Sequence, residues 1–269
     1  MRHFTRAAAT LLAAGGLLLV SAPVSAPAVA AAGIVNAPRH VLTVGKGTHG
    51  HGGGGSISAF GWASSNWSGY AVDTSKYSAI TGQWVVPAVS RTKGPTYSSS
   101  WIGIDGFNNS SLIQTGTEQD YSSHGAQYYA WWEILPAAET VITGDPVSPG
   151  DHMSASIVND GNGTWTITLN DTTKPWTFTT TQTYSGPATS AEWIEEAPTI
   201  GGHVATLAHY GQTTFDPGTV NASNPSLAPS DGGVMIQRRT QVSTPSVPDS
   251  DTDGFNMAYG STSPPAPAS

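Results

Sequence analysis

Short segments in which apolar and polar residues alternate are the feature that most constrains this chain. Residues 164–170 read TWTITLN, so every second side chain is apolar and lies on one face of a strand. Residues 175–181, PWTFTTT, alternate in the same way, and NDGNG at 159–163 is typical of a hairpin turn. We therefore expect a meander of three antiparallel strands from residue 152 to residue 181.

The strand pattern extends over residues 60–259, where Thr, Val, Ile, Trp and Tyr are common and charged residues are sparse. The segment GHVATLAHY at 202–210 is among the further strands expected. No segment has the period of a convincing amphipathic helix, and there is no internal repeat. Many short strands separated by Gly and Pro predict an all-β fold, either a sandwich or a jelly roll.

The N-terminus has the composition of a secretory signal peptide, which we place at residues 1–32. Arg2 and Arg6 make its start positive, residues 11–20 are apolar, and Ala-Val-Ala at 28–30 offers a cleavage site. The apolar stretch is shorter than the roughly 20 residues that span a bilayer. We therefore expect a secreted, extracellular protein that does not associate with a membrane once the signal is removed.

Two further segments differ in composition from the β-sandwich domain expected at 60–259. Residues 33–59 hold the tract GTHGHGGGGS and are expected to be a pro-segment or a linker. Residues 260–269, GSTSPPAPAS, are rich in Pro and Ser and are expected to be a disordered tail.

Cysteine content and charge exclude several functions. The chain has no cysteine, so it has neither disulfides nor thiolate chemistry. All 18 Asp and Glu follow residue 60, against six Lys and Arg, which gives this part of the chain a net charge of −12. Such a domain repels the phosphates of nucleic acid. It suits acidic surroundings, in which carboxylates become protonated and repel one another less.

Several well-known catalytic motifs are missing. The sequence has no G-x-S-x-G, no H-E-x-x-H and no G-x-x-x-x-G-K-[ST]. The histidines after residue 60 show no ligand spacing, and His49 and His51 in the Gly/His tract make only a weak metal site, so we expect neither a metal nor another cofactor. The side chains that remain as candidates for catalysis are carboxylates and amides.

Carboxylates beside tryptophans in strands are the first candidates, because a buried acid is usually either paired or functional. The segment YYAWWEIL places Tyr129, Trp131 and Glu133 on one face of a strand. In SSSWIGIDG, Trp101 shares a face with Asp105 at the end of the strand. Asp105 precedes a glycine, so a plain turn residue is an equally good interpretation.

A second strand, AEWIEEAP at 191–198, contains three glutamates. Alternation places Glu192, Ile194 and Glu196 on one face, and Trp193 and Glu195 on the other. The alternative is that these glutamates lie on the solvated face of an edge strand, since burial is not visible in a sequence.

Six short motifs follow one another along the chain. They are SSNWSGY (64–70), SSSWIGIDG (98–106), LIQTG (112–116), YYAWWEILP (128–136), VSPGD (147–151) and SAEWIEEAP (190–198). In this order they resemble the glutamic peptidases, or eqolisins, a family named for its catalytic Glu and Gln. The resemblance implies a concanavalin- or jelly-roll-like antiparallel β-sandwich of two large sheets, with the site on a concave face.

The resemblance also implies residue roles. Gln114 and Glu196 match the catalytic pair, in which the glutamate activates water as a general base and then acts as a general acid, while the glutamine stabilises the oxyanion. Supporting and substrate-binding positions map to Trp67, Trp101, Asp105 and Glu133. The implied function is a secreted acid endopeptidase that acts on polypeptides without a cofactor, and a monomer is expected.

Two features depart from the family's pattern. Fungal members carry cysteines, so a chain without them is closer to the bacterial-type members. The position before the catalytic glutamate is commonly aliphatic in the family, but here it is Glu195. Strand alternation argues against Glu195 as the catalytic residue. It does not separate Glu192 from Glu196, and only the motif match favours Glu196.

Two other functions stay open on the residues alone. A jelly-roll glycoside hydrolase would use Glu133 and Glu196 as its two carboxylates. A lectin-like carbohydrate-binding module would use the tryptophans as stacking platforms.

Overall fold

The computed structural model describes residues 59–269. The expected signal peptide at 1–32, and all but the last residue of the expected pro-segment at 33–59, lie outside the described residues. Among the described residues, no helix has the length and apolar character needed to cross a membrane. The regular elements, apart from the short 3-10 helix η2 (Pro229–Asp231), are the strands β1 (Trp62–Ser64), β2 (Trp67–Val72), β3 (Ala79–Val85), β4 (Ser99–Ile104), β5 (Ile113–Ser122), β6 (Gly125–Ile134), β7 (Thr140–Ile142), β8 (His152–Gly161), β9 (Thr164–Asp171), β10 (Trp176–Thr183), β11 (Ala191–Glu196), β12 (Thr199–Ile200), β13 (His203–Val204), β14 (Gln212–Val220), β15 (Gly232–Gln237), β16 (Thr240–Pro245) and β17 (Phe255–Tyr259).

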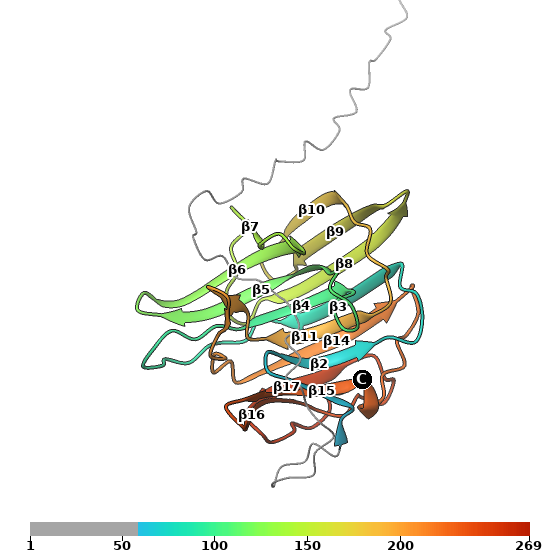
Figure 1. The fold of residues 1–269 in the computed structure, drawn as a ribbon. Coiled ribbons are helices and arrows are strands. Elements are labelled where there is room, and N and C mark those ends of the chain that lie inside the picture. Colours follow the sequence, from blue (N-terminus) through green and yellow to red (C-terminus); the bar gives the residue numbers. More distant parts are fainter. Residues whose placement is uncertain (1–58) are drawn as a thin grey trace, which may run out of the picture.

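Fifteen of these strands form one hydrogen-bonded sheet that folds back on itself (Figure 1). The spatial order is β10-β9-β8-β3-β14-β17-β16-β15-β2-β11-β4-β5-β6-β7, and β1 pairs with β15 in parallel. Strand β3 lies against β4, and β8 and β9 lie against β5, so the two halves of the sheet form two layers. The predicted antiparallel β-sandwich is confirmed, and β17, β16 and β15 join its layers at one edge.

The meander predicted over residues 152–181 is confirmed as β8, β9 and β10, which pair in that order. In β9, Trp165, Ile167 and Leu169 are buried, and the threonines between them are half-buried. One face of the meander therefore packs into the core and the other faces outward, as the alternation requires.

Tryptophan fills much of the space between the layers. Trp193 of β11 is 1% exposed, and its Nε1 donates to the carbonyl of Thr81 at 2.8 Å. Glycines of the opposite layer make room for the indole ring. A Cβ at Gly82 would lie 2.8 Å from Trp193 Cδ1, and one at Gly218 would lie 2.7 Å from its Nε1.

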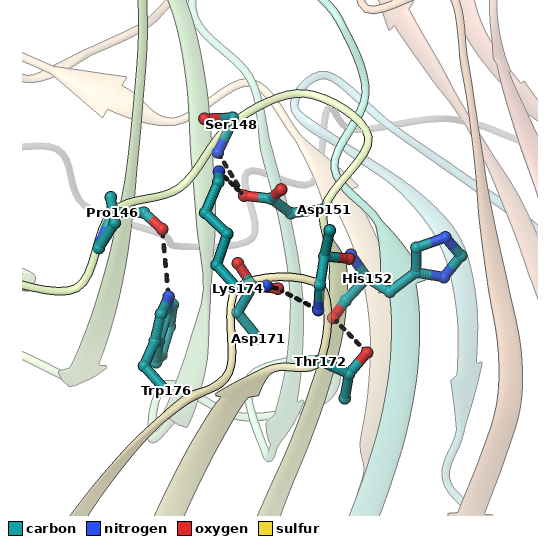
Figure 2. Close-up of polar contacts among 9 residues, drawn as sticks. Pro146, Ser148, Asp151, His152, Asp171, Thr172, Lys174 and Trp176 are labelled. Carbon is teal, nitrogen blue, oxygen red and sulfur yellow. Dashed lines mark hydrogen bonds and ion pairs between the residues drawn. The ribbon is translucent and has the colours of Figure 1, made fainter.

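Polar contacts tie together the two turns at the ends of β8 and β9 (Figure 2). The Asp151 carboxylate accepts the backbone N–H of Ser148 at 2.7 Å and the Lys174 ammonium at 2.6 Å. Trp176 Nε1 donates to the Pro146 carbonyl at 3.1 Å. The turn before β8 is thus held against the turn between β9 and β10.

Residues 260–269 differ from the disordered tail that we expected. They form no strand, but Asn256 Nδ2 donates to the Pro265 carbonyl at 2.9 Å, and Ser263 Oγ donates to the Pro245 carbonyl at 2.8 Å. Proline has no N–H to satisfy, so a Pro-rich segment can pack as an extended chain through its carbonyls alone.

The segment 202–210 also differs from the single strand that we expected, because only His203–Val204 forms one. Beyond it, Ala208 N donates to the Tyr97 carbonyl at 2.9 Å, and Leu207 N donates to Gln237 Oε1 at 3.2 Å. The backbone of this segment is therefore held by bonds to a loop and to a side chain, not by pairing with a neighbouring strand.

Replacing Trp193 by alanine tests the core. Trp193→Ala should lower the free energy of unfolding by about 3–5 kcal/mol, because it removes a buried indole and leaves a cavity. Urea denaturation measures this loss. Trp176→Ala, on the edge strand β10, is the matched control and should cost less than about 2 kcal/mol. Equal losses in the two variants would contradict the assignment of Trp193 to the core.

Candidate active site

Strand β11 lies between β2 and β4, and β5 and β6 follow β4 in the same layer. Cross-strand neighbours share a face of the sheet. Gln114 of β5 lies between Gly103 of β4 and Glu133 of β6. Glu196 of β11 lies opposite Ser99 of β4. Gln114, Glu133 and Glu196 therefore share one face, which we call the site face. It is opposite to the face that carries Trp193.

Trp101 of β4 spans the interval between Gln114 and Glu196. Its Nε1 donates to Glu196 Oε2 at 2.9 Å. The far edge of the ring lies over Gly103, where an added Cβ would come within 2.9 Å of Trp101 Cζ3 and 3.3 Å of Gln114 Cβ. A Cβ at Gly116 would lie 2.4 Å from Trp101 Cβ. Two glycines thus make room for the indole that links the two candidate residues.

The Glu196 carboxylate is held by two side-chain N–H groups. Asn66 Nδ2 donates to Oε1 at 2.9 Å, and Trp101 Nε1 donates to Oε2. Ser64 Oγ donates to Asn66 Oδ1 at 3.0 Å, which fixes the amide so that its nitrogen faces Glu196. Two donors from different strands fix the position of the carboxylate on the site face. The sequence interpretation missed Asn66, although it stands beside Trp67 in the motif SSNWSGY.

Gln114 and Glu133 are fully buried and bonded to each other. Gln114 Nε2 donates to Glu133 Oε2 at 2.6 Å. A primary amide has two N–H groups, so a bond through one of them fixes the direction of the other. The register therefore places Glu133 where it orients Gln114.

Trp67 lies on β2 beside Glu196. Its ring packs edge-to-face on Trp101, with centroids 4.8 Å apart. Both rings belong to an apolar cluster on the site face that also contains Leu112, Trp131 and Ile194. The Trp67 Nε1 atom is buried and has no acceptor among the described residues. It is a hydrogen-bond donor directed into this region of the sheet.

Asp105 ends β4 in a left-handed conformation, with φ of 72°. Its carboxylate accepts the Tyr184 hydroxyl at 2.6 Å, the Asn109 amide at 2.8 Å, and the backbone N–H groups of Ala188 and Thr189 at 2.7 and 2.8 Å. These four donors show Asp105 holding the segment that leads into β11. Its bonds to described residues do not include Gln114 or Glu196.

Glu192 also lies on the site face, and it is the glutamate of β11 that is in register with Gln114, through Gly103 of β4; Glu196 lies four residues further along β11. Neither of its carboxyl oxygens has a hydrogen-bond partner among the described residues. Burial raises the pKa of Glu192 well above its usual value, Asp105 and Asp73 raise it further, and the nearby Ser190 hydroxyl and Phe107 N–H offset this in part. A buried glutamate with a raised pKa in register with Gln114 remains a candidate for the catalytic base beside Glu196.

Glu195 lies on the opposite face, with Trp193, as alternation predicted. Ser100 Oγ donates to Glu195 Oε2 at 2.6 Å. Burial raises the pKa of Glu195 well above its usual value, Glu196 adds to the rise, and the Ser100 and Ser98 hydroxyls oppose it. Glu195 is thus a neutral member of the core.

Further carboxyl groups surround Glu118, which is in register with Ser99 and so lies on the site face. Burial raises the pKa of Glu118 well above its usual value, followed by repulsion from Asp120 and Glu139. Tyr129 donates its hydroxyl to Glu139 at 2.9 Å. Carboxyl groups of one sign are thus gathered at this end of the site face.

Comparison with known proteins identifies the family. Residues 65–258 match the Peptidase A4 family. Aspergillopepsin-2 from Aspergillus niger is 27% identical over 198 residues, which cover 64% of this chain and 70% of that protein.

Two solved structures have the same fold. Scytalido-glutamic peptidase, in complex with a transition state analog inhibitor, aligns with a TM-score of 0.62 and 22% identity over 72% of this chain and 98% of that one. Aspergilloglutamic peptidase from Aspergillus niger aligns with a TM-score of 0.53 and 26% identity over 61% and 99%.

The fold is therefore that of the glutamic peptidases. The chain belongs to the Peptidase A4 family and is a glutamic-type endopeptidase, as the motifs predicted. Its closeness to bacterial-type members stays a prediction.

The stability of the fold should fall as pH rises, because Glu195 is buried as a neutral acid. A carboxyl group whose folded-state pKa is raised stabilises the fold fully below its unfolded value, and the stabilisation is lost as pH rises through the folded value. Urea midpoints between about pH 4 and about pH 8 should decline, each such group contributing at most about 1.4 kcal/mol per pH unit. Glu195→Gln, which keeps a neutral polar group, should flatten the decline. An equally steep decline in this variant would contradict the assignment.

Proposed function

We propose that this protein is a secreted acid endopeptidase in which Glu196 is the general base and then the general acid, and Gln114 stabilises the oxyanion. The proposal rests on the motif match at Gln114 and Glu196 and on the Glu196 carboxylate, which is held by the N–H groups of Asn66 and Trp101. Glu196 lies four residues along β11 from the register position of Gln114, and Glu192, which occupies that position, is the alternative base. The motifs LIQTG and SAEWIEEAP support the same pair.

The reaction begins when the Glu196 carboxylate takes a proton from water, and the water oxygen attacks the peptide carbonyl carbon. The carbonyl oxygen then carries a negative charge in the tetrahedral intermediate. Glu196 returns its proton to the peptide nitrogen, the C–N bond breaks, and the amine leaves. A carboxylate base suits acidic conditions, because the ordinary pKa of a glutamate is about 4.3.

Gln114 suits the oxyanion because its amide is neutral and keeps its N–H donors at low pH, whereas a histidine would become charged. The bond to Glu133 at 2.6 Å holds the amide in place. We assign the other N–H to the oxyanion. A single donor of this kind is worth about 3–4 kcal/mol in the transition state. Glu133 is thus a positioning residue.

Trp67 and Trp101 are the proposed walls of the substrate site. The buried Trp67 Nε1, which has no acceptor among the described residues, can donate to a peptide carbonyl. Solved relatives include a complex of the eqolisin SCP-B with the tripeptide Ala-Ile-His, which supports polypeptide substrates. For Asp105 we propose a structural role at the end of β4.

We also propose export through the N-terminal signal at 1–32, with residues 33–59 as a pro-segment or linker, and a monomeric mature enzyme. The match to Aspergillopepsin-2 is compatible with an extracellular site of action. Mass spectrometry of the secreted protein gives the mature N-terminus directly. An active enzyme that retains residue 33 would refute a removed pro-segment.

Substitution of the pair tests the mechanism. Glu196→Gln should abolish proteolysis of a denatured protein at acidic pH, because the amide cannot accept the proton. Gln114→Ala should lower kcat about 10²–10³-fold, through loss of the oxyanion donor. Glu195→Gln, one residue away on the opposite face, is the matched control and should stay active. Near-wild-type activity of Glu196→Gln, together with inactivity of Glu192→Gln, would transfer the role of base to Glu192.

The glycoside hydrolase function fits the site less well. Glu133 and Glu196 are separated by three strand spacings of about 4.8 Å and by four residues along the strands at about 3.3 Å each. A retaining glycosidase needs its carboxyl groups about 5–5.5 Å apart.

Assay of one acidified sample on casein and on xylan or glucan discriminates these functions. We expect cleavage of casein alone. Hydrolysis of a glycan, or glycan binding without any hydrolysis, would overturn the peptidase mechanism.

A further inference from the structure

The loop between β16 and β17 carries the sequence DSDTDG at residues 249–254. This is the D-x-D-x-D-G pattern with which calcium loops of the EF-hand type begin. The chain has Gly260 at the twelfth position, where such loops carry a bidentate glutamate, and no helices flank the loop. The pattern alone is therefore only a reason to look at the geometry.

Three carboxylates converge at this loop. Asp216, Asp249 and Asp253 each offer an oxygen, and these atoms all lie within 4.8 Å of one another. Asp216 comes from β14, at the point where its pairing with β3 shifts register between Phe215 and Gly218. Residues more than 30 positions apart in the chain thus contribute to one cluster. No Lys, Arg or His within residues 59–269 forms an ion pair with any of the three.

Asp249 provides a separate sign of a ligand. It is 6% exposed, and its Oδ1 accepts the backbone N–H groups of Asp253 at 3.2 Å and Gly254 at 3.3 Å. Its Oδ2 is buried and has no hydrogen-bond partner in the described part of the chain. A buried carboxylate oxygen without a partner costs free energy unless a cation or another donor satisfies it.

The atoms around Gly254 show where Asp249 Oδ2 lies. A Cβ added at Gly254 would lie 2.7 Å from Asp249 Oδ2 and 2.6 Å from Asp216 Cγ. The two carboxyl groups therefore border the same small space, which any side chain at position 254 would fill.

From this geometry, we propose that Asp216, Asp249 and Asp253 bind a calcium ion. Calcium takes six to eight oxygen ligands in flexible geometry, so water and backbone carbonyls can complete a shell begun by three carboxylates. Magnesium requires a near-ideal octahedron and fits such an irregular set less well.

The ion would join β14 to the loop between β16 and β17, at the edge where the two layers of the sandwich meet. These strands are not the ones that carry the site face. Calcium would therefore stabilise the fold without taking part in peptide hydrolysis, and the proposal is independent of the catalytic pair.

Calorimetric titration of the chelator-treated protein with calcium chloride, at about pH 6 where aspartates are largely ionised, tests the site. We expect one ion per chain, with a Kd of about 0.1–1 mM or tighter, as in extracellular calcium modules. Saturating calcium should raise Tm by several degrees, because it binds only the folded state. Magnesium should bind at least tenfold more weakly.

Two variants make the test specific. Asp249→Asn should weaken calcium binding at least tenfold and remove the rise in Tm. Asp253→Asn, at a half-buried position that disturbs the fold less, should do the same. Asp160→Asn removes an equal charge from the exposed hairpin between β8 and β9 and should bind calcium as the wild type does. Absence of binding at millimolar calcium, equal binding of magnesium, or an unchanged Tm response in both site variants would overturn the proposal.

Discussion

The structure depends on the pairing of β11 with β2 on one side and β4 on the other. Successive residues of a strand point to opposite faces, so six residues supply Trp193 to the core and Glu196 to the site face. A slip of one residue would exchange these faces and expose the indole. The burial of Trp193 against Gly82 and Gly218 therefore also fixes where the catalytic candidate lies. Stability and the position of the site are specified by the same strand.

Buried acids are the second constraint, because only six Lys and Arg follow residue 60. The protein accommodates its carboxyl groups in different ways. Asp151 pairs with Lys174, Asp105 accepts four neutral donors, and Glu195 keeps its proton beside Ser100. Asp249 has an oxygen for which the described residues offer no donor, and a bound cation would satisfy it. A domain with this excess of acids carries fewer like charges in acid than in neutral solution.

The alternation of apolar and polar residues, together with the order of the motifs, predicted the features that depend on residues close together in the sequence. Alternation alone placed Glu192 and Glu196 on one face and Glu195 on the other, and the meander at 152–181 followed from the same rule. Contacts between distant segments could not be predicted. The bond from Asn66 to Glu196 joins residues 130 positions apart, and the approach of Asp216 to Asp249 depends on how β14 pairs. Two signals are present in the sequence itself: Asn66 in the motif SSNWSGY, and the spacing of the acids at 249–254, which histidine spacing does not reveal.

The sequence pattern does not fully distinguish the three glutamates of β11 by function. Their hydrogen-bond partners in the structure differ. Glu192 shares the site face but lacks hydrogen bonds, and Glu195 is bonded to a hydroxyl inside the core. In both, burial raises the pKa above its usual value. Glu196 receives the two N–H donors that suit a carboxylate. The departure from an aliphatic residue at position 195 then has a simple explanation, because a protonated glutamate bonded to Ser100 can fill a core position as a neutral side chain.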